Sequence, residues 1–316
     1  MSENIVSDVS KPKISLTQGL RAKLFGAGSF KYWSLAPLII ILFIFTVLPI
    51  FQLLQMSVSE LTFVEGKLES EYIGLGHFDD LAKDPIAGIA IKNTLVYVVT
   101  VVILETFTGF FLAVAISRTK TFSTLYRSVV IIPLLIPPVA IGTMWSLMYD
   151  YNYGLFTTIL ISLGVNNPPL WTADPDLALI SVVIVDVWHW TSFMFLIMLA
   201  GIESIPPSLL EAARVDGANE RTIIRRVILP IMAPTILVAM LLRTILAFKV
   251  FDQIFVLTSG GPGTATQVIS MHIYKIFSEQ ARFGYAAFLS LLVAAIMTIF
   301  VAFYLWANDM IRRNLT

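Results

Sequence analysis

Six long apolar segments set the strongest limit on what this chain can fold into. Each is about as long as the roughly 20-residue helix that crosses the hydrocarbon core of a bilayer. They cover about residues 33–56, 93–117, 128–149, 177–202, 231–258 and 284–307. Only 13% of the residues are charged, whereas soluble domains carry about 25%. The sequence therefore predicts an all-α, polytopic membrane protein: six transmembrane helices within residues 32–316, preceded by a tail of residues 1–31.

Basic residues in the connections predict the orientation of these helices. Fourteen lysines and arginines fall in the N-terminal tail, the second and fourth connections and the C-terminal end, against five in the other three connections. Because cytoplasmic segments carry such an excess, we expect both termini to be cytoplasmic. In the tail, Leu16, Leu20 and Leu24 recur every four residues. This spacing fits a helix lying in the membrane interface, with a frayed tail as the alternative.

Several classes of site are excluded or disfavoured by composition. The chain has no cysteine, and its three histidines, His77, His189 and His272, are far apart in the sequence. Disulfides are thereby excluded, and no metal-ligand spacing is present. Acidic and basic residues balance at 21 each, so no basic excess indicates nucleic acid. We find no nucleophile–base constellation, and the sequence predicts that the chain is not an enzyme.

The fourth connection, residues 203–230, carries the most specific local signals. Pro206 and Pro207 suit the start of a helix, where a missing amide donor costs little. Gly217 suits a left-handed position that ends this helix, and Asn219 is a good N-cap for a second one. The sequence therefore predicts two short helices around a tight turn on the cytoplasmic side.

The same loop resembles a motif of a known family. Glu211-Ala212-Ala213 is followed by Gly217 and then by Leu229-Pro230. This pattern is similar to the loop motif of permease subunits in binding-protein-dependent ABC importers, with Val227 at a position where the family has isoleucine. The runs Asp216–Ala218 and Phe251–Gly263 resemble the carbohydrate branch, of the maltose- or glycerol-3-phosphate-permease type. The resemblance covers residues 90–316 well and the rest poorly.

That resemblance implies a type I ABC importer permease in the bacterial inner membrane. In the family, the first loop helix inserts into a cleft of a separate ATPase subunit and couples nucleotide-driven closure to alternating access. The implied docking residues are Glu211, Ala212, Ala213, Arg214, Asp216 and Gly217. The implied partners are a second, different permease, two ATPase subunits that bind ATP and magnesium, and an extracytoplasmic solute-binding protein. This chain would hold no cofactor, and its sequence has no Walker motif.

Ionisable residues within the apolar segments indicate candidate positions on the solute pathway. Each costs roughly 2.5–3.5 kcal/mol on insertion scales, so it normally faces protein or water. Asp186 and His189 are three residues apart, as are Lys249 and Asp252, and each pair can share a helix face. Together with neighbouring aromatic and amide groups, which suit sugar rings and hydroxyls, the candidate pathway residues are Asp186, Trp188, His189, Lys249, Phe251, Asp252 and Gln253. The alternative role is structural ion pairing, which we expect for Glu105 and Arg243.

Two further expectations concern the external side and the mode of transport. The run Thr258–Gly263 has no Lys-Ser or Lys-Thr after it and is not a phosphate loop. We expect an irregular loop near the pathway mouth that the solute-binding protein contacts. The predicted cargo is a sugar or sugar-like solute, such as an oligosaccharide, polyol, glycoside or sugar phosphate. A stand-alone, ion-driven carrier or channel is the alternative function.

Overall fold

The computed structural model describes residues 27–64, 67–119 and 121–315. The chain divides into two compact units, Met1–Gln55 and Met56–Thr316. The first unit contributes α2 (Ala27–Met56), which is apolar throughout and has no buried residue in its Trp33–Met56 window. Such a helix suits a lipid environment. The interfacial helix predicted around Leu16, Leu20 and Leu24 lies outside the described residues.

The second unit begins with a β-hairpin, which the all-α prediction did not include. Strand β1 (Ser59–Val64) pairs antiparallel with β2 (Lys67–Tyr72). Leu61 is buried whereas Thr62 is exposed, and an alternation of period two is that of a strand with one covered face. A short helix, α3 (Gly76–Lys83), follows the hairpin. The first connection is therefore partly β-structure.

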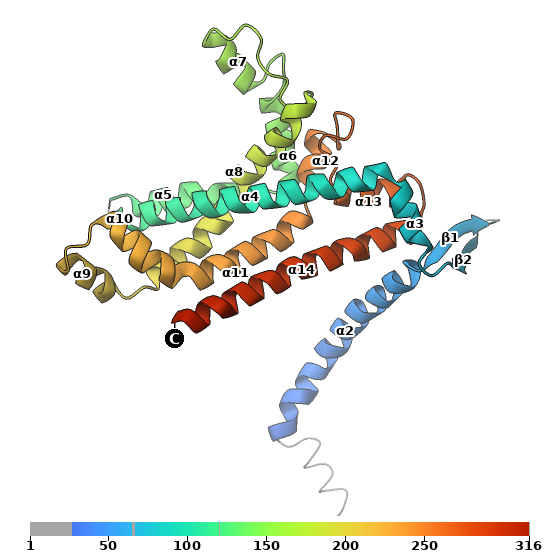
Figure 1. Ribbon diagram of the computed structural model, residues 1–316, viewed down its shortest axis with the longest axis horizontal. Coiled ribbons are helices and arrows are strands. Elements are labelled where there is room, and N and C mark those ends of the chain that lie inside the picture. Colours follow the sequence, from blue (N-terminus) through green and yellow to red (C-terminus); the bar gives the residue numbers. More distant parts are fainter. Residues whose placement is uncertain (1–26, 65–66, 120, 316) are drawn as a thin grey trace, which may run out of the picture. The chain divides into compact units, whose positions relative to one another are not determined.

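Four long helices form the body of the second unit. Helices α4 (Pro85–Ser117) and α8 (Pro175–Glu203) pack along each other (Figure 1). Helix α11 (Leu229–Phe248) packs against both of them, and α14 (Phe283–Leu315) lies against α11. Ser117 and Glu203, the last residues of α4 and α8, line one cavity. Because α4 and α8 therefore run in the same direction, the chain between them must cross back.

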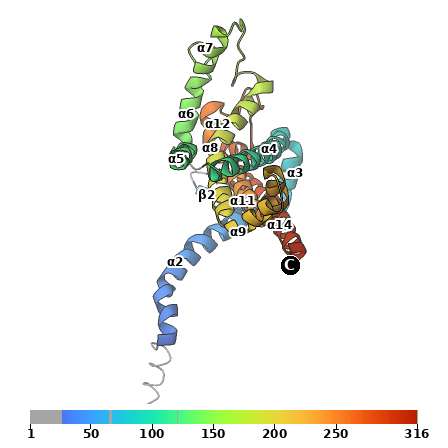
Figure 2. The same cartoon turned by 90° about the vertical axis from the view of Figure 1, so that its left-hand side faces the viewer.

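That return crossing is a broken helix. Helix α5 (Ser123–Ile131) continues as a 3-10 turn over Ile132–Leu135, and α6 (Pro138–Met148) then departs at 97°. Pro133, Pro137 and Pro138 account for this bend, because proline lacks the amide donor that would continue a helix. Helix α6 packs against α12 (Asp252–Leu257), whereas Figure 2 shows the following α7 (Leu155–Ser162) extending away from the four long helices of this unit. Among the described residues, five helices are long and apolar enough to cross a membrane, and there are six such spans if the bent pair counts as one.

The predicted continuous helix over 231–258 is wrong at its C-terminal end. Helix α10 (Glu220–Ile223) leads through a π-helical stretch, Ile224–Ile228, into α11, which ends at Phe248. Helix α12 (Asp252–Leu257) begins only after three non-helical residues, and α13 (Ile269–Ser278) follows it. At the break, the backbone carbonyl of Val250 accepts a hydrogen bond from the Ser270 hydroxyl. Such substitute partners allow a helix to break at membrane depth.

Helices α4 and α8 approach closely at Gly109, which gives a first testable prediction. A Cβ added at Gly109 would lie 2.8 Å from the Met194 Cβ and 3.0 Å from the Phe195 backbone nitrogen. We expect Gly109→Ala to destabilise the protein by about 1–3 kcal/mol, because the helices must separate. The measurement is the melting temperature of the purified protein. Gly88→Ala is the matched control on the same helix, since nothing lies within 4 Å of its added Cβ. Equal melting of the two variants would contradict the close packing.

Candidate functional site

The loop of residues 203–230, here called the docking loop, has the predicted two-helix form. Helix α9 (Pro207–Val215) starts with a proline at its first position. Gly217 follows it with φ +80°, the left-handed conformation expected there. The Asn219 side chain accepts a hydrogen bond of 2.9 Å from the Thr222 amide and so caps α10. The local structure expected from these residues is confirmed.

The predicted docking residues lie on α9 or on the two residues that follow it, and this segment is accessible. No residue of α9 is buried, and α9 stands at one end of the helical body while α3 and the β-hairpin stand at the other (Figure 1). Of the six predicted docking residues, five are exposed and Ala213 is half-buried. The next side chain, Val215, is 87% exposed. This surface, which mixes charged and apolar side chains, is therefore accessible to another protein chain.

A cavity of about 590 Å³ lies behind α9, between the docking loop and the ends of α4 and α8. Glu220 bridges its walls through ion pairs with Arg118 and Arg214. Burial, together with the neighbouring Arg214, lowers the pKa of Arg118 from its ordinary value. A second ion pair, Arg127 with Glu203, joins the start of α5 to the end of α8. The second and fourth connections are thus held together, as two loops on the same membrane face should be.

A buried charge cluster joins three helices in the interior of the unit. Arg243 of α11 donates from Nε to Glu105 of α4 at 2.5 Å and from Nη2 to the second Glu105 oxygen at 2.9 Å. Its Nη2 also donates to Asp186 of α8. The Trp190 ring lies 4.9 Å from the guanidinium carbon, a cation–π arrangement. All three charged side chains are almost fully buried, which agrees with the structural role expected for Glu105 and Arg243.

A cavity of about 190 Å³ opens where α11 breaks. Asp186, Trp190 and Arg243 contribute one side, and the break with the start of α12 contributes the other. Gln253 is almost fully buried; its Nε2 donates to His189 Nδ1 at 2.9 Å, whereas its Oε1 has no hydrogen-bond partner. A buried, unpartnered amide oxygen beside a cavity is a place for a ligand hydroxyl or a water molecule.

The structure brings most of the seven candidate pathway residues together, but in different pairs from those expected. Five of them line the cavity: Asp186, Lys249, Phe251, Asp252 and Gln253. His189 stands behind Gln253, and Trp188 faces another way, with its ring 5.7 Å from the Trp145 ring. Asp186 pairs with Arg243, not with His189. Lys249 and Asp252 do not share a helix face, because Lys249 caps the end of α11 and Asp252 starts α12.

The run Thr258–Gly263 forms the irregular loop that was expected. Ser259, Gly260 and Gly263 adopt positive φ angles, which no helix or strand accommodates. The amide of Asn93 on α4 donates to the backbone oxygens of Thr264 at 3.0 Å and Gln267 at 3.1 Å. The loop is therefore anchored to α4 near the break in α11.

Sequence reasoning missed a polar network at the end of the body opposite α9. The Asp84 carboxylate caps α4 and accepts hydrogen bonds from His272 Nε2 at 2.8 Å and from the Tyr285 hydroxyl at 3.0 Å. Burial alone would raise the pKa of Asp84, but the bonds from His272 and the Ala87 amide outweigh it, so this pKa lies below its ordinary value. The Asp84-Pro85 pair, a capping residue before a proline, was the available sequence signal.

Comparison with known proteins places this geometry among membrane transport components. Residues 105–315 match the family model described as "Binding-protein-dependent transport system inner membrane component". The trehalose/maltose transport system permease protein MalF of Thermococcus litoralis is 34% identical over 87% of this chain and 92% of its own. The sulfoquinovosyl glycerol transport system permease protein SmoG of Agrobacterium fabrum is 32% identical over 86% and 87%.

Solved structures agree with the sequence relatives. A subunit of a bacterial alginate ABC transporter, solved in complex with an alginate pentasaccharide-bound periplasmic protein, superposes with a TM-score of 0.80. The alignment covers 93% of this chain and 97% of that one at 26% identity. The likeness thus extends over nearly the whole length of both chains.

Proposed function

The chain belongs to the family of binding-protein-dependent transport system inner membrane components, and we propose from this that it carries a sugar or sugar-like solute across the membrane. It is a transport subunit of an ABC importer and not an enzyme. Relatives named for trehalose and maltose, sulfoquinovosyl glycerol and sn-glycerol-3-phosphate support this range of cargo. The ion-driven carrier considered above is not favoured.

The observation that carries the proposal is the cavity at the break in α11. It combines the unpartnered Gln253 oxygen with charged groups and with the aromatic rings of Trp190 and Phe251. Sugars require both kinds of contact, because their hydroxyls need polar partners and the apolar faces of their rings stack on aromatic side chains. With about 190 Å³ of space, the cavity holds part of a sugar, and closure against a second, different permease would complete it.

The energy for transport would come from other chains. The sequence has no Walker motif, so ATP and magnesium would bind to two separate ATPase subunits. We assign α9 as the element that docks on one of them. ATP-driven closure of the ATPases would then bias the two permeases between inward- and outward-open states, since an equilibrium shifts only through differential binding to its states. An extracytoplasmic binding protein would deliver the solute near the Thr258–Gly263 loop.

Gln253 provides the test of the proposed cavity. We expect Gln253→Leu to raise the KM for transport roughly tenfold or more, because a ligand hydroxyl would lose its buried partner. The measurement is uptake into vesicles that contain the complete importer, with the sugar identified by thermal-shift screening of the cognate binding protein. The control is Trp188→Leu, a neighbour of the cavity residues that points elsewhere. Unchanged uptake by Gln253→Leu would contradict the cavity as a solute site.

A further inference from the structure

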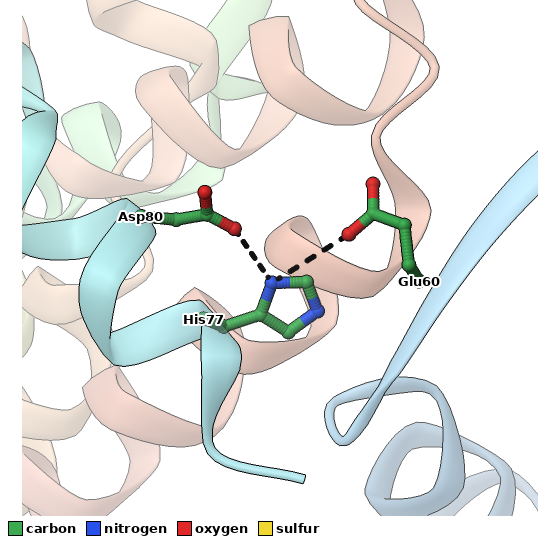
Figure 3. A group of neighbouring side chains, drawn as sticks. All are labelled: Glu60, His77 and Asp80. Carbon is green, nitrogen blue, oxygen red and sulfur yellow. Dashed lines mark hydrogen bonds and ion pairs between the residues drawn. The ribbon is translucent and has the colours of Figure 1, made fainter. Parts of the chain in front are cut away.

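Three metal-ligand atoms converge at the end of the body opposite α9. His77 Nδ1 lies 3.0 Å from Asp80 Oδ2 and 4.0 Å from Glu60 Oε2 (Figure 3). All three ligand atoms lie within 4.8 Å of one another. Zinc binds imidazole nitrogen and carboxylate oxygen at about 2.0–2.2 Å, so neighbouring ligands of a tetrahedral site are about 3.3 Å apart. The spacing between His77 and Asp80 is close to this value, whereas the partly exposed Glu60 carboxylate would have to move closer when a metal ion binds.

The imidazole of His77 is held in one orientation. Its Nε2 lies 3.2 Å from the backbone oxygen of Ser59, to which it donates, and the side chain is completely buried. Gly284 allows this packing, because a Cβ there would lie 2.0 Å from the Ser59 oxygen and 2.9 Å from Nε2. Histidine ligands of metals characteristically donate their other ring N–H to a carbonyl or carboxylate. The arrangement therefore directs Nδ1 at the two carboxylates.

A divalent cation can take the place of the proton in the hydrogen bond between His77 Nδ1 and Asp80. Because Nε2 donates to the Ser59 oxygen, Nδ1 is the ring atom that faces the two carboxylates and is left to bind the ion. The Glu60 and Asp80 side chains are each about one third exposed, so solvent gives both an entry path and a water as fourth ligand. We propose that Glu60, His77 and Asp80 form a zinc site that fastens strand β1 to α3. Mixed imidazole and carboxylate donors suit zinc better than magnesium or calcium.

Arg282 is the competing cation near this site. Its Nη2 donates to Asp80 Oδ2 at 2.9 Å. In the metal-free protein, His77 Nδ1–H and Arg282 both donate to Asp80 Oδ2. Zinc would replace the Nδ1 proton, while Arg282 keeps a second lone pair of Asp80. The two states differ in whether Nδ1 carries a proton or a metal ion, and zinc titration distinguishes them.

The test is zinc binding to the full-length, chelator-treated protein at neutral pH. Isothermal titration with zinc chloride should show one ion per chain, and X-ray absorption should show one nitrogen and at least two oxygen ligands at about 2.0–2.2 Å. His77→Gln should weaken binding at least about tenfold. Glu60→Gln should weaken zinc binding too. Because Glu60 is partly exposed, this variant tests the site even if the buried His77 variant fails to fold. His272→Gln is the control, since His272 bonds Asp84 and lies outside the cluster.

Magnesium chloride in the same titration should give no comparable binding. If zinc does not bind, or binds equally well to His77→Gln, the proposal is overturned and His77 Nδ1 serves only as a hydrogen-bond partner of Asp80. The experiment measures zinc binding and not transport. Its outcome therefore tests the metal site independently of the proposed cargo.

Discussion

Replacing Arg243 with methionine will cause a large loss of stability. The change leaves Glu105 and Asp186 as neighbouring carboxylates in the interior, with no guanidinium to accept bonds from. Removal of one partner from a buried ion pair typically destabilises a protein by about 3–5 kcal/mol. We expect a correspondingly lower melting temperature and poor recovery of folded protein from the membrane, measured by fluorescence-detected size exclusion.

The control for Arg243→Met replaces the whole cluster. In the triple variant Glu105→Met, Asp186→Leu and Arg243→Met, no unpaired charge remains, and replacement of complete buried ion clusters by apolar residues is often neutral or stabilising. We expect this variant to recover most of the lost stability and still to transport poorly, because Asp186 and Arg243 both line the cavity. If Arg243→Met melts like the unmodified protein, the charge cluster does not hold the helices together.

The number and position of the membrane-spanning helices could be predicted from the sequence, because each span depends mainly on its own residues. Each apolar run of sufficient length stabilises one crossing largely regardless of the others. The breaks within the spanning helices were harder to predict. The three prolines of the third span indicate a bend through their own backbone chemistry, but the end of α11 at Phe248 depends on Ser270, which bonds the freed Val250 carbonyl from 20 residues away. The hairpin was not predicted, because its second strand carries the exposed Glu69 and Glu71, and glutamate is uncommon in strands.

Among the candidate sites, too, features set by the local sequence could be predicted, whereas contacts between distant residues could not. Pro207, Gly217 and Asn219 shape the docking loop through their own backbone preferences, so its form follows from the local sequence. Arg243 and Glu105 are 138 residues apart, and the sequence indicated that each needs a partner without indicating which. The same holds for His77, whose distance from Glu60 in the sequence concealed the convergence of their ligand atoms. Pairings made by tertiary packing were therefore not predicted.

We expect Gly217→Val to disconnect this subunit from the proposed ATPase partner. A β-branched residue disfavours the φ of +80° that turns the chain from α9 into α10, and because nothing lies within 4 Å of an added Cβ, the effect is conformational and not a clash. A misdirected α9 would lose the contacts of Glu211 and Ala212. At about 2 kcal/mol or more for a central interface contact, the affinity for the ATPase falls roughly thirtyfold.

The measurement is co-purification with the ATPase subunits, together with ATPase activity stimulated by the solute-loaded binding protein. Gly164→Val is the matched control: Gly164 has φ +88° and equally open surroundings, but follows α7 in the third connection, which we predict to be external. Both variants carry a similar backbone strain. A loss of ATPase binding in Gly217→Val alone would therefore be due to the docking loop. Full coupling in Gly217→Val, or equal loss in Gly164→Val, would show that α9 does not transmit the ATPase motion.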